Sequence, residues 1–325
     1  MTLQFPDTNS RHFQILSLAG GGYMGYFTAS LLEHIEEKSG PIAEKTDLLA
    51  GTSVGSLIAL ALAANVPAKK ISNIMRERGG AIFPTPVFPL LKWFGSIKSA
   101  KIDPIPLAQT ISDLVGDLTL GDLSHNVIVP AVNMTSGSFR VFKGGPMGND
   151  IDSDVLVSDV ALASSAAPIY FPAHPIGGEV FADGGLIANA PDIIAAQTAI
   201  SDLKSNSAYT RMLSIGTTSK KLGIRSGEDL DWGVKDWVPD ILEYSMASQV
   251  DLSRYLTQML LGQENVYVVD PLRSEQQDKG LGLDKAGTVA VSILNGMSQQ
   301  AFRNLYSDAD KAFIEKWYRH EKDSV

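Results

Sequence analysis

The first 65 residues repeat one order of elements twice: a short apolar run, a glycine-containing turn and a helix. Residues 13–19 predict a buried strand that leads directly into a glycine-rich turn and an amphipathic helix over residues 26–38. Residues 47–50 predict a second strand, again followed by a glycine-containing turn and by a helix over residues 56–64. Because parallel strands need crossover helices, two such units favour an α/β architecture with helices on both faces of a mostly parallel sheet.

The rest of the chain adds strands up to residue 219 and is mainly helical after it. Residues 79–101 interrupt the pattern with aromatic residues and with prolines that forbid a long helix, so they predict a loop or lid. No repeat, low-complexity tract or linker divides the chain, which predicts a single domain over residues 1–325 with about six strands in its sheet. Further strands are predicted at residues 127–132, 139–142, 180–182 and 211–215, an edge strand at 266–269, and helices at 237–261 and within 288–320.

Composition and charge exclude several classes of protein. A chain of 325 residues with 44% apolar and 19% charged residues can bury a large core. The 36 acidic residues outnumber the 27 basic ones, giving a net charge of −9, and no basic run exceeds a pair. A nucleic-acid polymer is therefore not an expected partner, since such binding relies on clustered cations. The absence of cysteine excludes disulfides, thiolate metal sites and cysteine nucleophiles, and neither a metal site nor a cofactor is predicted.

The sequence predicts no membrane-spanning segment. Its best apolar run, residues 57–64, is less than half of the ~18 residues that a spanning helix needs. The start of the chain lacks the charged start, apolar stretch and cleavage site of a secretory signal, so a cytoplasmic location is expected. Peripheral contact with the inner face of the membrane stays compatible with this pattern.

A serine stands at the second turn. Gly51-Thr52-Ser53-Val54-Gly55 matches the pattern G-x-S-x-G between a strand and a helix. There the flanking glycines let a sharp turn close while the serine hydroxyl points out at the helix N-terminus, where the helix dipole favours negative charge. Ser53 is therefore a candidate nucleophile. The alternative is an ordinary helix entry with Ser53 or Thr52 as the N-cap.

The first turn, Gly20-Gly21-Gly22-Tyr23-Met24-Gly25, also fits the dinucleotide pattern G-x-G-x-x-G. A dinucleotide site, as in a dehydrogenase, needs an acidic residue at the end of the second strand. Here Asp47 stands at the start of that strand and the serine turn at its end. Three consecutive glycines can instead expose successive backbone N–H groups to an oxyanion. A tight turn without a ligand is the third interpretation.

A carboxylate is the candidate partner of Ser53. Asp183-Gly184-Gly185 follows a predicted strand, with Asn189 shortly after it, and the glycines would let the aspartate approach the serine closely. An ordinary Asp-Gly turn is the alternative. The only histidine after Asp183 is His320, in a charged stretch near the C-terminus, and His174 follows Pro172 in a predicted loop. The sequence thus offers a serine with a carboxylate partner and no convincing imidazole.

These three motifs, in this order, resemble the patatin-like phospholipase family. Residues 163–168, 170–172 and 213–217 are also similar to stretches of that family, and the resemblance covers about residues 13–217. It implies a three-layer α/β/α patatin-like fold, with residues 13–217 as the catalytic region and residues 218–325 as a helical C-terminal extension. Two positions depart from the family pattern: Ala19 stands where members usually have Asp, and Met24 where they have Arg or Lys.

The resemblance implies hydrolysis of fatty acyl esters of membrane phospholipids by a Ser-Asp dyad. Ser53 would be the nucleophile and Asp183 the proton acceptor, without a cofactor. The backbone N–H groups of Gly21 and Gly22, together with Gly20, would form the oxyanion hole. The glycines of the three motifs that would support this arrangement are Gly25, Gly51, Gly55, Gly184 and Gly185.

A narrower resemblance and two alternatives complete the sequence-based hypotheses. Residues 120–123 and the helical tail are similar to bacterial patatin-like effectors that a cyclic dinucleotide activates in antiphage signalling, which adds a cyclic dinucleotide to the expected partners. A homo-oligomer is a separate expectation. A general serine esterase and a non-catalytic, nucleotide-regulated binding protein stay open. Phe88, Trp93 and Phe94, flanked by lysines, have the composition of a membrane contact, although such residues also build loops that cap a core.

Overall fold

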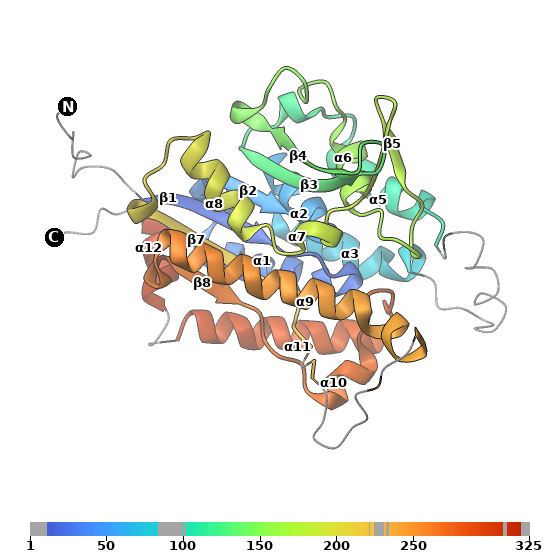
Figure 1. Ribbon diagram of the computed structural model, residues 1–325. Helices are drawn as coiled ribbons and strands as arrows, with labels where there is room; N and C mark the ends of the chain where they lie inside the picture. Colours follow the sequence, from blue (N-terminus) through green and yellow to red (C-terminus); the bar gives the residue numbers. More distant parts are fainter. Residues whose placement is uncertain are drawn as a thin grey trace.

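A computed structural model describes residues 12–83, 100, 102–220, 222–223, 231, 234–307 and 311–319. Within these residues an eight-stranded sheet lies between two layers of helices (Figure 1). Its order is β5-β6-β3-β2-β1-β7-β8, and β4 pairs with β3 beside this path. The strands are β1 (Phe13–Leu18), β2 (Leu48–Gly51), β3 (Val127–Asn133), β4 (Ser138–Gly144), β5 (His174–Ile176), β6 (Glu179–Asp183), β7 (Thr210–Ile215) and β8 (Val266–Val269).

The five strands from β3 to β8 in this order run parallel, whereas β4, β5 and β6 are joined by antiparallel pairings. Successive side chains of each parallel strand point to opposite faces of the sheet, and both faces are buried. In β1, Leu16 and Leu18 pack with one helical layer and Ile15 packs with the other. This explains why the strands read as continuous apolar runs.

The helices divide between the two faces. One layer is built around α1 and α2, and the other consists of α8, the long α9 and the short α7 (Figure 1). The first layer contains α1 (Gly25–Ser39), α2 (Val54–Ala63), α3 (Ala68–Ile82), α5 (Ile105–Val115), α6 (Val157–Ser164), α11 (Thr288–Leu305) and α12 (Lys311–Arg319). The remaining helices are α7 (Gly185–Ala188), α8 (Asp192–Ser201), α9 (Val234–Leu261) and α10 (Glu275–Gly280).

Two strands end beside the middle of β3, and this brings their C-termini together. The start of β3 pairs in parallel with β2, and its last residues pair with β6 in the antiparallel direction, with Ala131 opposite Asp183. Pro130 lies between the two pairings, where its missing N–H costs no ladder bond. The chain therefore leaves β2 and β6 at one place, and there it carries Ser53 and Asp183.

Most predicted elements are present within a residue or two of the expected bounds. The sheet has eight strands instead of about six, because β8 joins it and because β5 was not predicted. The interruption predicted from residue 79 is wrong for its first part, since α3 continues to Ile82. The predicted membrane-contact residues Phe88, Trp93 and Phe94 lie outside the described residues.

Candidate active site

Ser53 lies in a strained turn between β2 and α2. Its backbone has φ 55° and ψ −126°, a conformation that non-glycine residues rarely adopt. The turn can close because Gly51 has no side chain. A Cβ atom there would lie 2.2 Å from the Gly55 carbonyl oxygen. The Ser53 N–H donates to Ser164 Oγ (3.1 Å), and that hydroxyl donates to the Pro130 carbonyl (2.8 Å). The predicted turn therefore exists, and Ser164 fixes it to the centre of the sheet.

Gly55 permits a second close approach in this turn. A Cβ atom there would lie 2.2 Å from the carbonyl oxygen of Leu18, the last residue of β1. Gly25 has a corresponding role at the start of α1, since its Cβ would meet both methyl groups of Val54 at 2.5 Å. These two glycines hold the first and second turns against each other.

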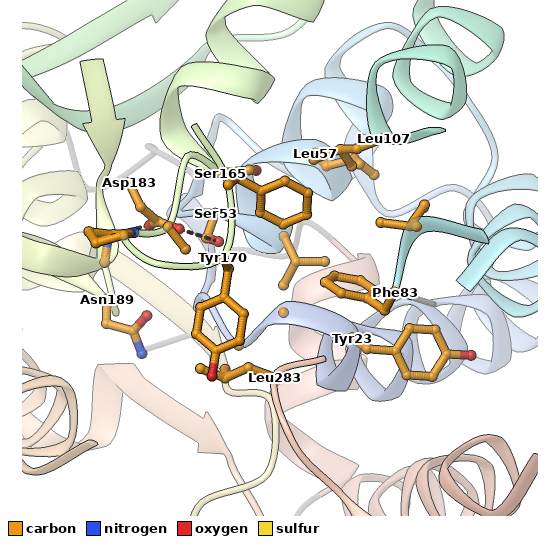
Figure 2. A pocket seen from close by; sticks show the side chains of 18 of the residues that line it. Tyr23, Ser53, Leu57, Phe83, Leu107, Ser165, Tyr170, Asp183, Asn189 and Leu283 are labelled. Atoms are coloured by element: carbon orange, nitrogen blue, oxygen red, sulfur yellow. Dashed lines mark hydrogen bonds between the residues drawn. The ribbon is translucent and has the colours of Figure 1, made fainter. Parts of the chain in front are cut away.

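Asp183 ends β6 and faces the serine (Figure 2). Ser53 Oγ donates to Asp183 Oδ2 at 2.8 Å, and the Gly185 N–H donates to Oδ1 at 2.6 Å. The chain after β6 can approach β3 because Gly184 has no side chain. A Cβ atom there would lie 2.2 Å from the Pro130 carbonyl oxygen. Only 5% of Asp183 is exposed, and this burial raises the pKa of its carboxyl to about 6, against the opposing effect of the two hydrogen bonds.

The glycine turn contributes two free donors instead of three. The Gly20 N–H donates to the Asn189 carbonyl (2.9 Å), and the Gly20 carbonyl accepts from Thr217 Oγ1 (2.9 Å). Gly20 is therefore an anchor, and the geometry does not support it as an oxyanion donor. Among the described residues, the N–H groups of Gly21 and Gly22 have no hydrogen-bond partner, and both glycines line the same cavity as Ser53.

The C-terminal part of the chain supports this turn from behind, which the sequence analysis missed. The Tyr23 N–H donates to the Leu283 carbonyl (2.9 Å), and a Cβ atom on Gly22, whose φ is 57°, would lie 2.3 Å from that oxygen. Arg273 Nη1 donates to Met24 Sδ at 3.1 Å. A cation thus does reach the position where the family pattern has one, but it comes from 249 residues further along the chain.

A narrow apolar cavity opens beside the serine and aspartate. In Figure 2, Ser53 and Asp183 lie at one side of it and Leu57, Leu107 and Phe83 at the other. Such a cavity favours an extended hydrocarbon group over a charged one. Its apolar and aromatic lining residues are Tyr23, Val54, Leu57, Met75, Ile82, Phe83, Leu107, Ala167, Pro168, Tyr170, Phe171, Leu186, Met246 and Leu283.

Other catalytic groups do not reach this cavity. None of the four described histidines lines it, and the ring of His174 lies instead against Asp159 (Nε2 to Oδ1, 2.9 Å). Asp47 accepts the Gln14 N–H at the opposite end of β2, so it does not complete a dinucleotide site at the glycine turn. The parts of the chain that the structure describes contain no cluster of three or more acidic or histidine side chains that could hold a metal ion.

Comparisons with known proteins agree with the three motifs and their geometry. The family model described as patatin-like phospholipase matches residues 16–195. The chain belongs to this family. It is 34% identical over 300 residues to a cGAMP-activated phospholipase of Pseudomonas aeruginosa, covering 91% of this chain and 90% of that protein. Membership of the patatin-like phospholipase family makes the chain an enzyme, an acyl ester hydrolase.

Two further similarities lie at lower coverage or identity. A cGAMP-activated phospholipase of Vibrio cholerae is 34% identical over 234 residues, which cover 65% of this chain and 66% of that protein. The crystal structure of VipD from Legionella pneumophila aligns with a TM-score of 0.43 at 14% identity, over 90% of this chain and 67% of VipD. None of the helices in the described residues combines the length and the hydrophobicity that crossing a bilayer requires.

Proposed function

We propose that this patatin-like enzyme cleaves fatty acyl esters of membrane phospholipids with Ser53 as nucleophile and Asp183 as its base. The observation that carries the proposal is the hydrogen bond from Ser53 Oγ to Asp183 Oδ2 (2.8 Å), because both side chains line an apolar cavity. A serine that donates to a buried carboxylate, without an imidazole, is set for direct proton transfer to that carboxylate.

The reaction follows from these positions in two steps. Ser53 Oγ attacks the ester carbonyl while its proton moves to Asp183 Oδ2, and the N–H groups of Gly21 and Gly22 receive the oxyanion. The ester C–O bond breaks as Asp183 returns the proton to the leaving alkoxide, which leaves an acyl-serine. Water then attacks this acyl-serine and passes a proton to Asp183, and the fatty acid leaves with Ser53 protonated again.

Burial of Asp183 serves this chemistry because it narrows the difference in proton affinity between carboxylate and hydroxyl. An aspartate of ordinary pKa is a poor base, and the raised pKa of about 6 makes Asp183 a stronger one that is still ionised at neutral pH. The apolar cavity would hold the acyl chain, and the ester would lie between the serine and the glycine turn.

We expect the pH dependence of kcat/KM to follow the pKa of Asp183. Since Asp183 must be ionised to accept the proton, kcat/KM for a soluble short-chain ester should fall about tenfold per pH unit below pH 6. The acid limb therefore lies above the ordinary aspartate range, because the carboxyl pKa is raised. A pH–rate profile from pH 4.5 to 8 measures it, and a rate that stays constant down to pH 5 would contradict the assignment of Asp183 as base.

The cavity predicts acyl-chain selectivity. Leu107 lies across the cavity from Ser53, so Leu107→Trp should fill the space of the distal methylenes (Figure 2). We expect hydrolysis of a sixteen-carbon ester to fall about tenfold relative to a four-carbon ester, since each buried methylene contributes about 0.8 kcal/mol. Val289→Trp, on the exposed face of α11, is the control. Equal loss on both esters would place the acyl chain elsewhere.

Activation by a cyclic dinucleotide in antiphage defence is the second part of the proposal. The activation is supported by the relatives whose names include cGAMP activation, one of them aligned over 91% of this chain. A general serine esterase is the alternative, and it would act on short soluble esters but not on vesicle lipid. The non-catalytic binding protein is not retained, because the family is one of acyl ester hydrolases. The lipid enzyme would work from the cytoplasm at the membrane surface, as a homo-oligomer. Phe88, Trp93 and Phe94, which lie outside the described residues, would contact the bilayer.

Product analysis tests both parts of the proposal. Phospholipid vesicles are incubated with the protein, with and without cGAMP, and fatty acid and lysophospholipid are measured by mass spectrometry. We expect both products, more of them with cGAMP, and neither from Ser53→Ala. A short-chain soluble ester is assayed in parallel. Hydrolysis of that ester with no release from vesicles would indicate a general esterase, and no release from vesicles or ester would overturn the proposed reaction.

A further inference from the structure

A second, polar cleft lies behind the glycine turn. It has a volume of about 780 Å³ and is bounded by the turn, the loop after β7, α9 and the segment around α10. This size is in the range of sites for drug-sized ligands and exceeds what one phosphate group fills. We call it the polar cleft, and the residues that carry the argument are Thr218, Lys220, Arg254, Asp270, Arg273 and Asp278.

The walls of the polar cleft carry charges of both signs. Lys220 Nζ lies 2.9 Å from a carboxylate oxygen of Glu243 and 3.9 Å from one of Asp278. Arg273 Nη1 lies 3.3 Å from Asp278, and Arg254 Nη1 lies 2.9 Å from Asp270. A ligand that fits such walls has both anionic groups for the cations and N–H or O–H groups for the carboxylates.

The same walls hold an unusual share of unsatisfied polar atoms. Of the twelve buried side-chain atoms without a hydrogen-bond partner in the described residues, six belong to residues that line the polar cleft. Arg273 and Asp270 each have side chains that are 7% exposed. Because buried polar atoms are nearly always paired, this concentration indicates a site that a polar ligand completes. The six atoms are Asn189 Oδ1, Thr218 Oγ1, Arg254 Nε and Nη2, Asp270 Oδ1 and Arg273 Nε.

The glycine turn and the residues that contact it separate the polar cleft from the apolar cavity. Five residues line both spaces: Gly21, Tyr170, Asn189, Met246 and Leu283. The Leu283 carbonyl accepts the Tyr23 N–H, and Arg273 Nη1 donates to Met24 Sδ. A ligand that changes the position of Arg273 or Leu283 therefore changes the two N–H groups that would receive the oxyanion.

We propose that the polar cleft binds a cyclic dinucleotide and that Arg273 links its occupancy to the glycine turn. The inference rests on the function proposed above and assigns its activator a place. The phosphodiester groups of such a ligand would form ion pairs with Lys220 and Arg273 in place of Asp278. Its base and ribose N–H and O–H groups would donate hydrogen bonds to the carboxylates. The ion pairs of Lys220 and Arg273 with Asp278 are thereby exchanged for contacts with the ligand.

Equilibrium binding of cGAMP to the full chain tests the location without requiring hydrolysis. Lys220→Met removes one cation of the polar cleft, and Arg273→Lys keeps a charge but loses the planar fork of donors. Both should weaken binding at least tenfold, and Arg273→Lys should also lower the maximal stimulation of ester hydrolysis by cGAMP. Lys69→Met is the matched control, because Lys69 also pairs with a glutamate (Glu37, 3.0 Å) but lies on α3, outside the polar cleft. Its binding should equal that of the wild type.

Each outcome decides the inference. Wild-type affinity in both polar-cleft variants would place the nucleotide elsewhere and overturn it, without touching the phospholipase assignment. Failure of the wild type to bind cGAMP would overturn both the inference and the proposed activation by a cyclic dinucleotide. The product analysis would still test the proposed hydrolysis of phospholipids. Glycerophosphoethanolamine binding that competes with cGAMP at comparable affinity would make the cleft a lipid head-group site, which also overturns it. Weakened binding in both variants supports it even if the wild type hydrolyses no lipid.

Discussion

Ser53→Ala and Asp183→Asn should each lower kcat/KM for ester hydrolysis at least about 10⁴-fold, and the double variant should be no slower than either. Alanine removes the nucleophile, and the asparagine amide cannot accept the proton that the hydroxyl must lose. The two side chains share a hydrogen bond of 2.8 Å and act as one unit, so their effects on the activation free energy should not add.

The measurement is the initial rate on a soluble ester, with circular dichroism to show that each variant is folded. Ser298→Ala is a suitable control, because Ser298 is a fully buried, hydrogen-bonded serine on α11 that lines neither cavity. It should keep the wild-type rate within about twofold. If Asp183→Asn retained more than a tenth of the wild-type rate, another base would be required and the histidines would have to be reconsidered.

The strands and turns that position the dyad were predictable because their signals are local. A strand buried on both faces, such as β1, is a continuous apolar run. The glycine turn follows β1 directly, and the serine turn follows β2. β5 carried no such signal: it is the three-residue run His174–Ile176 with a central proline, and it is a strand only because β6 pairs with it. The loop or lid predicted from residue 79 begins later than expected, because α3 continues to Ile82 and Gly79 packs closely on the ring of Tyr23.

The candidate site was predictable only in part, for the same reason. The identities of Ser53, Asp183, Gly21 and Gly22 follow from short motifs. The use of the Gly20 N–H by Asn189, and the support of the turn by Arg273 and Leu283, depend on contacts between segments that are far apart in the sequence. Arg273 in particular lies in no motif, so the missing cation at Met24 could be noted from the sequence but its replacement could not be found there.

Asp183→Asn should also make the folded protein more stable above pH 6. The buried carboxyl has a pKa of about 6 in the folded chain, against the ordinary aspartate value of 3.8. Because the folded pKa is raised, the favourable contribution of the protonated group is complete below pH 3.8 and is lost as the pH rises through 6. At pH 8 the ionised aspartate therefore lowers the free energy of unfolding by about 3 kcal/mol relative to acid pH, from 1.36 kcal/mol per pKa unit. Asparagine stays neutral, and its Oδ1 can still accept the Gly185 N–H.

We expect urea unfolding of Asp183→Asn to show a gain of about 1–3 kcal/mol at pH 8 that disappears towards pH 4, together with the loss of activity. Asp152→Asn is the contrasting control. That carboxylate is 1% exposed but forms an ion pair with Arg140 and accepts the Lys143 N–H at 3.1 Å, so its neutralisation should destabilise the protein at pH 8. A gain in Asp183→Asn that is equal at pH 4 and pH 8 would show that packing, and not the burial of a charge held for catalysis, accounts for the difference.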